Sequence, residues 1–135
     1  MAEANYRPLT QIHGVGLYTA GALAGILGPG HRFRSEAHLA AYAGVAPLEA
    51  SSAGLGRHRL NRGGNRRLNA ILYRIALSQA RSWPEAQAYV ARRQAEGKTW
   101  REAIRALKRS LIRGLWRLWQ ECLMATERTI EHQAA

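Results

Sequence analysis

Aspartate is missing from this sequence, and its nine acidic residues are all glutamate. Nucleases and transposases that depend on metal ions usually hold Mg²⁺ with a cluster of aspartate and glutamate side chains. The glutamates here are scattered along the chain, and most of them stand among basic residues. We therefore expect no metal site and no cofactor within this chain.

Cysteine and long apolar segments are also scarce. Cys122 is the single cysteine, which excludes an internal disulfide and a zinc site built from cysteines. No apolar run approaches the roughly 20 residues that a bilayer span requires, and the opening M-A-E-A-N-Y-R is not a signal peptide. These absences favour a cytoplasmic protein that is not embedded in a membrane.

Positive charge is what the sequence has in excess. Lysine and arginine together number 20, which gives a formal net charge of +11, and arginine outnumbers lysine 18 to 2. A GC-rich genome also favours arginine, so the placement of the charge is more informative than this ratio. Residues 1–53 carry no net charge, residues 54–81 carry +7 and residues 82–135 carry +4. Such an excess indicates a polyanionic partner, first nucleic acid and second an acidic membrane surface.

The spacing of apolar residues predicts an all-α fold. They recur at helical intervals, and no segment alternates convincingly with period two. The 135 residues suffice for one domain with a modest core. We expect a single domain of about five to six helices over residues 1–125, followed by a tail at 126–135. The predicted helices lie at about 9–12, 19–27, 36–43, 66–81, 84–94 and 100–124, with a long basic loop between helices three and four.

The segment at about 8–27 resembles a helix-hairpin-helix, with a tight turn at His13-Gly14-Val15-Gly16. In this motif glycines expose backbone N–H groups to a DNA phosphate near a helix N-terminus, without needing basic side chains. Gly14 and Gly16 are therefore candidate phosphate-binding positions, whereas His13 is expected to be a turn residue. The alternative is an ordinary αα-hairpin with a glycine turn.

Residues 44–65 are too polar and too rich in glycine for a helix or a buried strand. Two adjacent serines, Ser51 and Ser52, stand before a group of arginines. The arginines are Arg57, Arg59, Arg62, Arg66 and Arg67. Hydroxyl groups among guanidinium groups, with glycines that let a backbone approach a ligand, suit phosphate chemistry. The alternative is a flexible and solvated basic loop.

The helix boundaries carry capping signals of their own. Ser35 can cap the helix at 36–43, and Asn65 can cap the helix at 66–81. The pattern Ser82-x-x-Glu85 predicts a capping box at the start of the next helix. Thr99-x-x-Glu102 predicts a second capping box, which opens the longest helix.

Arginines recur every four residues along one flank of that longest helix. They are Arg101, Arg105, Arg109, Arg113 and Arg117. This basic row is either a solvated face or a surface for nucleic acid or another partner. Trp116 and Trp119 flank the apolar stripe of the same helix and are expected to be core or interface residues.

Four motifs, taken in order, resemble one protein family. They are L-x-x-I-x-G-V-G-x-x-T-A from Leu9, F-R-S-E-A-H-L-A-A-Y-A-G-V-A-P from Phe33, S-S-A-G from Ser51 and R-x-x-L-N-R-G-G-N-R-R-L from Arg57. The chain resembles the carboxy-terminal, serine-bearing domain of insertion-sequence transposases of the IS-one-ten/IS-one-sixteen type, which are related to Piv-type DNA invertases. The similarity covers roughly residues 8–110.

The resemblance implies partners that this chain does not contain. Full-length members carry an amino-terminal RuvC-like domain with four acidic metal ligands, and Mg²⁺ is expected only together with that domain. In the family a structured guide RNA specifies the target and donor DNA. The implied partners are therefore DNA, a guide RNA and a RuvC-like domain or full-length transposase, in a homo-oligomer associated with the nucleoid. No membrane partner is expected.

The resemblance also implies a serine nucleophile for DNA strand exchange in transposition. In the family the serine lies a few residues after the G-x-A-P turn, at an S-G step, and this position corresponds to Ser52. The step here reads S-S-A-G, so Ser51 remains the alternative. Ser52 Oγ would attack a phosphodiester, form a phosphoserine and release a 3′-hydroxyl. The loop arginines up to Arg62 would stabilise the charge of the phosphorane, and His58 is a candidate local base.

Two other functions fit the same residues. One is a non-catalytic nucleic-acid-binding module whose whole purpose is the helix-hairpin-helix and the basic loop. The other is a decayed transposase fragment with no selected role. Trapping a covalent protein–DNA adduct would separate the transposase from both.

Overall fold

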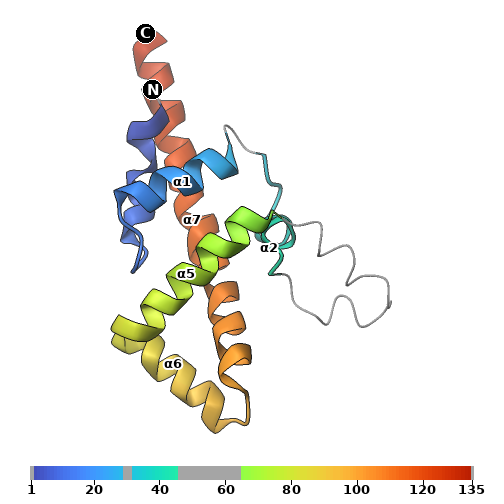
Figure 1. Cartoon of the computed structure of the whole chain (residues 1–135). Helices are drawn as coiled ribbons and strands as arrows, with labels where there is room; N and C mark the ends of the chain where they lie inside the picture. Colours follow the sequence, from blue (N-terminus) through green and yellow to red (C-terminus); the bar gives the residue numbers. More distant parts are fainter. Residues whose placement is uncertain (1, 29–31, 46–64, 135) are drawn as a thin grey trace, which may run out of the picture.

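The computed structural model describes residues 2–28, 32–45 and 65–134, and these residues form helices without any strand (Figure 1). The prediction of an all-α single domain is confirmed. In chain order the described helices are the 3₁₀ helix η1 (Ala2–Gln11), α1 (Leu17–Leu27), α2 (Glu36–Ala43), α5 (Arg66–Ser82), α6 (Pro84–Ala95) and α7 (Trp100–Ala134).

Helix α7 is the axis on which η1, α2, α5 and α6 pack, while α1 packs on η1 and α5 (Figure 1). Its apolar residues recur at intervals of three and four and face the core, as predicted. The buried positions of this stripe are Ile104, Leu107, Leu111, Leu115 and Leu118. Full burial of one such side chain contributes about 1.5–3 kcal/mol. Helix η1 lies along the second half of α7, α5 crosses its middle, and α6 connects the far end of α5 to the start of α7 (Figure 1).

Helix α2 begins and ends where its capping residues predict. The Ser35 hydroxyl accepts a hydrogen bond from the His38 N–H at 3.1 Å. Gly44 ends the helix in the left-handed region, with φ of 76°, a conformation that favours glycine. Phe33 and Leu39 are buried and anchor this segment to the core.

One of the two predicted capping boxes is confirmed and the other is wrong. The Thr99 N–H donates to Glu102 Oε1 at 2.8 Å, and the Glu102 N–H donates to Thr99 Oγ1 at 3.1 Å. By contrast, α5 continues through Ser82, whose hydroxyl donates to the Ser78 carbonyl at 2.9 Å. Helix α6 therefore starts from Trp83, which makes no side-chain cap hydrogen bond.

The two ends of the chain differ from the sequence-based expectation. The first helix is a 3₁₀ helix that spans residues 2–11 rather than a short α-helix at 9–12. Helix α7 does not end near Met124 but continues to Ala134. No glycine or proline interrupts this extension, and the Thr126 hydroxyl donates to the Cys122 carbonyl one turn earlier. Among the described residues, no helix combines the length and apolarity of a membrane span.

Candidate nucleic-acid interface

The turn between η1 and α1 is fixed by one glycine and one buried valine. The Ile12 N–H donates to the Leu9 carbonyl at 3.1 Å, and the Val15 N–H donates to the Ile12 carbonyl at 3.0 Å. Gly14 between them has φ of +93°, which a side chain would strain. Val15 is 5% exposed and packs into the core. The predicted hairpin is therefore present, and its shape depends on Gly14.

A buried glutamine holds this hairpin against α5. Gln79 is 2% exposed, and its Nε2 donates to the His13 carbonyl at 2.8 Å. The His13 ring stacks on Trp83, with 5.3 Å between ring centroids, and its Nε2 lies 3.3 Å from Ser82 Oγ. His13 is a turn residue, as expected. The role of Gln79 was not predicted from the sequence. Its position on the apolar stripe of α5 could have indicated a buried polar side chain that needs a hydrogen-bond partner.

The N-terminus of α1 is open to solvent. Gly16 is the N-cap residue, but no side chain caps the helix, and its first turn contains no acidic residue. The first N–H groups of an α-helix have no intrahelical acceptor, and the helix dipole adds partial positive charge there. A Cβ built on Gly16 would meet nothing within 4 Å. An anion can therefore approach this end of the backbone closely.

Two arginines of α5 lie beside this open end. A hollow of about 160 Å³ is lined on one side by Gly14, Tyr18 and Thr19, and on the other by Arg67 and Arg74. We call it the hairpin hollow. Tyr18 at its edge is 91% exposed. Among the described residues no acidic side chain lines it. The hollow thus combines a glycine turn, a helix N-terminus and two guanidinium groups.

Only some of the predicted nucleic-acid-binding residues lie together in the hairpin hollow. Gly14 and Arg67 line the hairpin hollow, whereas Gly16 and Arg66 are exposed nearby but do not line it. Arg74 was not among the predicted binding residues. It lies two turns after Arg67 on α5, and only the packing of α1 on α5 brings it beside the hairpin.

The predicted serine site lies outside the described residues. The residues concerned are Ser51, Ser52, Arg57, Arg59 and Arg62, together with the long basic loop itself. The structure does show where the chain enters and leaves this segment. The Asn65 N–H donates to the Tyr42 carbonyl at 2.6 Å, and Asn65 Nδ2 donates to the Tyr42 hydroxyl at 3.0 Å. The end of α2 and the start of α5 are therefore joined side by side.

Asn65 and Tyr42 are supported by further contacts. Asn65 Oδ1 accepts the Leu68 N–H at 2.8 Å and so caps α5, as predicted. The Arg32 guanidinium lies 4.8 Å from the Tyr42 ring centroid. Its hydrogen bond to the hydroxyl lowers the pKa of Tyr42. Sequence reasoning missed this Arg32–Tyr42–Asn65 cluster, because the whole serine segment separates Asn65 from the other two residues.

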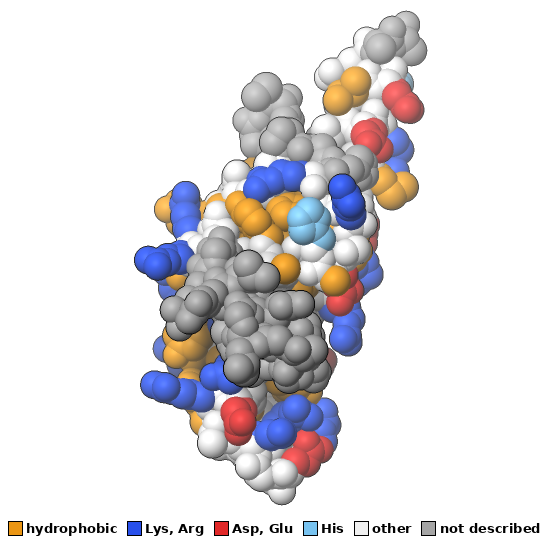
Figure 2. Space-filling view, turned by 90° about the vertical axis from the view of Figure 1, so that its right-hand side faces the viewer, with side chains coloured by type: hydrophobic (Ala, Val, Ile, Leu, Met, Phe, Trp, Pro, Cys, Tyr) orange, Lys and Arg blue, Asp and Glu red, His pale blue; other side chains and the backbone are white. Residues whose placement is uncertain are grey.

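The basic row of α7 is not one continuous surface. Arg113 Nε lies 3.7 Å from Glu36 Oε2 of α2. Arg117 instead lines a groove of about 680 Å³ beside the hairpin. Arg101 and Arg105 line a third hollow between α5 and α7, which we call the aromatic hollow. Figure 2 shows basic side chains spread over one face of the molecule, with few acidic ones among them.

No metal-binding cluster is found in the part of the chain that the structure describes. There, no three side chains of histidine, cysteine, aspartate or glutamate lie close enough to hold an ion. The groups that the described residues do offer to an anion are backbone N–H groups at the start of α1 and the guanidinium groups of α5.

Comparison with known proteins identifies the family of this chain. Residues 6–91, which include the hairpin, α2 and α5, match the model of the family described as Transposase IS116/IS110/IS902 family. The chain belongs to this family. The resemblance drawn from the four motifs is thus confirmed at the level of the transposase family.

Individual relatives match over most of the chain. An insertion element IS110 uncharacterized 43.6 kDa protein of Streptomyces coelicolor is 36% identical over 84% of this chain and 28% of its own length. Pilin gene-inverting proteins of Moraxella lacunata and Moraxella bovis are 35% and 34% identical, each over 82% of this chain and 36% of their own length. The chain thus spans about a third of the length of these relatives. No solved structure gives a significant match.

Proposed function

We propose that this chain is the DNA-binding and strand-exchange part of a bacterial transposase, and that it is incomplete without an acidic metal-binding domain. The observation that carries the proposal is the hairpin hollow, with its uncapped helix end and two guanidinium groups, in a member of a transposase family. Relatives named for inversion of a pilin gene also support a recombination reaction on DNA.

In the hairpin hollow the DNA backbone is the ligand. A phosphate at the N-terminus of α1 accepts hydrogen bonds from main-chain N–H groups, while Arg67 and Arg74 neutralise its charge. Such contacts are independent of base sequence and fix the position of a duplex on the protein. Choice of target by base pairing with a guide RNA is compatible with this kind of contact, because the protein itself need not distinguish bases.

The strand-exchange step uses a serine of the segment between α2 and α5. Ser52 Oγ loses its proton to a base and attacks phosphorus, and the bond from phosphorus to the 3′-oxygen breaks. The products are a phosphoserine and a 3′-hydroxyl, whose oxygen takes up a proton. The arginines that follow Ser52 stabilise the extra negative charge of the phosphorane. Ser51 is the alternative nucleophile.

The remaining chemistry is assigned to a partner. A RuvC-like domain, carried by a second chain or by a full-length transposase, would supply the carboxylates that hold Mg²⁺. This division fits the absence of aspartate from this sequence. Strand exchange joins two DNA sites, so the functional assembly is expected to be a homo-oligomer.

A covalent adduct assay tests the serine mechanism. With the acidic domain and Mg²⁺ supplied, the wild-type chain should form a protein–DNA adduct and Ser52→Ala should form none. DNA affinity should stay within about threefold, an effect below ~1 kcal/mol. If Ser51→Ala loses the adduct while Ser52→Ala keeps it, the nucleophile is Ser51. Adduct formation by the double variant would contradict a serine nucleophile.

The isolated chain provides the second test. It should bind duplex DNA but cleave none when Mg²⁺ alone is added, because the carboxylate ligands are supplied by the partner. Nicking that depends on metal and survives rigorous purification would contradict the division of labour. Duplex binding without any adduct in the complete system would instead identify a non-catalytic binding module.

A further inference from the structure

The aromatic hollow lies between α5 and the first two turns of α7, and its lining is unusual for a protein surface. Tyr73 and Trp100 border it, and each is 43% exposed. Three cations, Arg101, Arg105 and Lys108, complete the polar part of the lining. The volume is about 250 Å³, which corresponds to about eight water molecules. A planar ring system of nucleobase size can occupy such a space.

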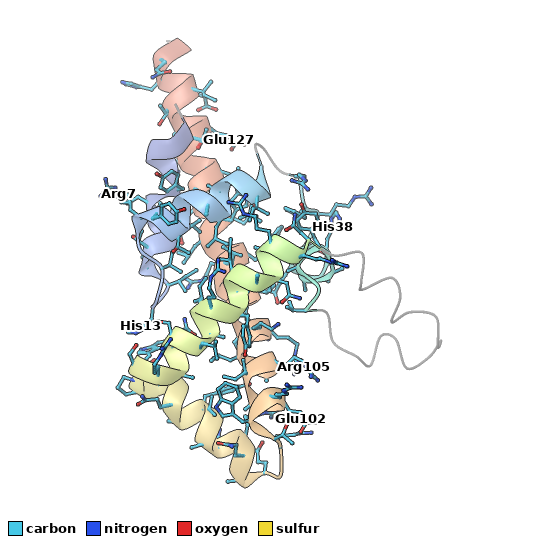
Figure 3. The ribbon with its side chains drawn as sticks, viewed as in Figure 1. Arg7, His13, His38, Glu102, Arg105 and Glu127 are labelled. Carbon is cyan, nitrogen blue, oxygen red and sulfur yellow. The ribbon has the colours of Figure 1, made fainter. Side chains whose placement is uncertain are left out.

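Positive charge exceeds negative charge around this hollow. Among the described residues no acidic side chain lines it. The nearby Glu102 is held at the helix start by its hydrogen bonds with Thr99, and its carboxylate also interacts with Arg105. Arg105 is exposed and projects from α7 in Figure 3. The hollow therefore offers aromatic faces and three cations beside a single glutamate.

Lys108 links the two helices that form the hollow. Its Nζ donates to Asn69 Oδ1 at 2.8 Å and lies 5.7 Å from the Tyr73 ring centroid. Burial and the neighbouring Arg105 lower the pKa of Lys108. These contacts place the lysine of α7 beside the Tyr73 ring of α5. An aromatic side chain has few rotatable bonds and therefore loses little conformational entropy on binding.

The aromatic hollow and the hairpin hollow lie on different sides of α5. Tyr73 lines the first and Arg74 the second, and successive residues of an α-helix project about 100° apart. In Figure 3, His13 of the hairpin and Arg105 of the aromatic hollow lie on opposite sides of α5. A ligand in one hollow therefore leaves the other accessible.

We propose that the aromatic hollow binds an unpaired nucleotide of single-stranded nucleic acid. The base stacks on Tyr73 and Trp100, and the adjoining phosphates bind Arg101 and Arg105. Stacking on exposed aromatic rings combined with basic side chains is how proteins hold single strands without reading their sequence. A duplex cannot use this site, since its bases are already stacked on one another. This inference rests on the proposed function in so far as the partner is a nucleic acid.

Short oligothymidylate, oligouridylate and an abasic oligodeoxynucleotide of equal length are the probes for this site. Wild-type protein should bind the two base-bearing strands at least about tenfold more tightly than the abasic strand. The double variant Tyr73→Leu/Trp100→Leu should bind all three alike, at the abasic level. A preference between the thymidylate and uridylate strands would assign the site to DNA or to RNA.

Matched variants separate stacking from charge. Arg101→Ala/Arg105→Ala should flatten the salt dependence on single strands by roughly 0.7 in log–log slope for each lost phosphate contact. Arg92→Ala removes an exposed arginine of α6 that lies outside both hollows. It should change neither the affinity for single strands nor the affinity for duplex DNA. Circular dichroism and thermal melting verify folding of each variant.

The results that would overturn the inference are specific to this site. Equal wild-type affinity for base-bearing and abasic strands, or full base preference in the Tyr73/Trp100 variant, would contradict it. A duplex titration of the same proteins decides the proposed function independently, because duplex binding depends on the hairpin hollow. Tighter binding of an acidic peptide than of any oligonucleotide would reassign the aromatic hollow to a protein partner.

Discussion

The hairpin hollow and the aromatic hollow share helix α5 but offer different groups to an anion. In the hairpin hollow the decisive groups belong to the backbone, at Gly14 and at the open start of α1, and two arginines assist. In the aromatic hollow the candidate binding groups are all side chains, namely Tyr73, Trp100 and three cations. We propose that the first arrangement binds the phosphate of a duplex and that the second binds an exposed base. Under these two proposals, α5 stands between a site for paired nucleic acid and a site for unpaired nucleic acid.

The largest effect is expected from Gln79→Ala, which would release the hairpin from α5. The change leaves the partly buried His13 carbonyl without its donor and creates a small cavity at the buried Gln79 position. We expect unfolding free energy to fall by about 3 kcal/mol in urea denaturation. The matched control is Gln87→Ala, because Gln87 also donates to a carbonyl, that of Arg81, but at an exposed site. Its cost should stay below about 1 kcal/mol. Equal losses in the two variants would show that Gln79 does not anchor the hairpin.

Gly14→Ala should have the next largest effect, and it distinguishes the two hairpin glycines. Gly14 has φ of +93°, so a side chain there costs about 1–2 kcal/mol. Gly16 has φ of −90° and open space around its Cβ position. Gly16→Ala should therefore leave the melting temperature nearly unchanged, with a stability change within about 0.5 kcal/mol. Equal destabilisation by the two substitutions would contradict this assignment of Gly14.

A smaller effect tests which arginines contact the duplex. Arg67→Ala/Arg74→Ala should flatten the slope of log affinity against log salt by about 1.8, which is 0.9 for each phosphate contact. The control is Arg101→Ala/Arg105→Ala, which should leave the duplex slope unchanged. If the control pair flattens the slope and the α5 pair does not, the duplex binds along α7 rather than at the hairpin.

The smallest effect concerns Cys122, which reports whether η1 and its hairpin stay packed on α7. The thiol is buried beneath Leu9, and burial raises its pKa to about 11. The folded pKa therefore exceeds the unfolded value of about 8.5. Burial of the neutral thiol therefore stabilises the fold in full at pH values below the unfolded pKa. This stabilisation is lost as pH rises through the folded pKa, where the buried thiol ionises. Alkylation by iodoacetamide at mildly alkaline pH should be limited by global unfolding. Rapid alkylation of folded protein would show that η1 opens locally.

The two hollows also differ in how far the sequence alone could predict them. The hairpin was predictable because its signal is local: Gly14-Val15-Gly16 stands between two apolar stretches, and closely spaced glycines at such a place indicate a turn. The capping signals at Ser35, Asn65 and Thr99 were predictable for the same reason. Each of these capping residues forms its hydrogen bond with a residue only three positions away in the sequence.

The aromatic hollow was not predictable, because it depends on packing over a long sequence distance. Tyr73 and Trp100 are separated by α6, and only the crossing of α5 on α7 brings them to one hollow. The same reason explains why Gln79 and Arg74 were missed. The basic row on α7 was predicted to lie on one flank, either as a solvated face or as a binding surface. The helices packed on α7 divide this flank, so that Arg101 and Arg105 line one hollow, Arg117 lines another and Arg113 lies beside Glu36.

The most direct measurement is the duplex affinity of Gly16→Ala across a range of salt concentrations. A methyl group at Gly16 keeps every charge and leaves the fold intact, but it stands where a phosphate must approach the start of α1. If the backbone of the hairpin binds the phosphate, affinity should fall severalfold while the slope against log salt stays the same, because no cationic contact is removed. Wild-type affinity in Gly16→Ala would contradict backbone recognition at the hairpin.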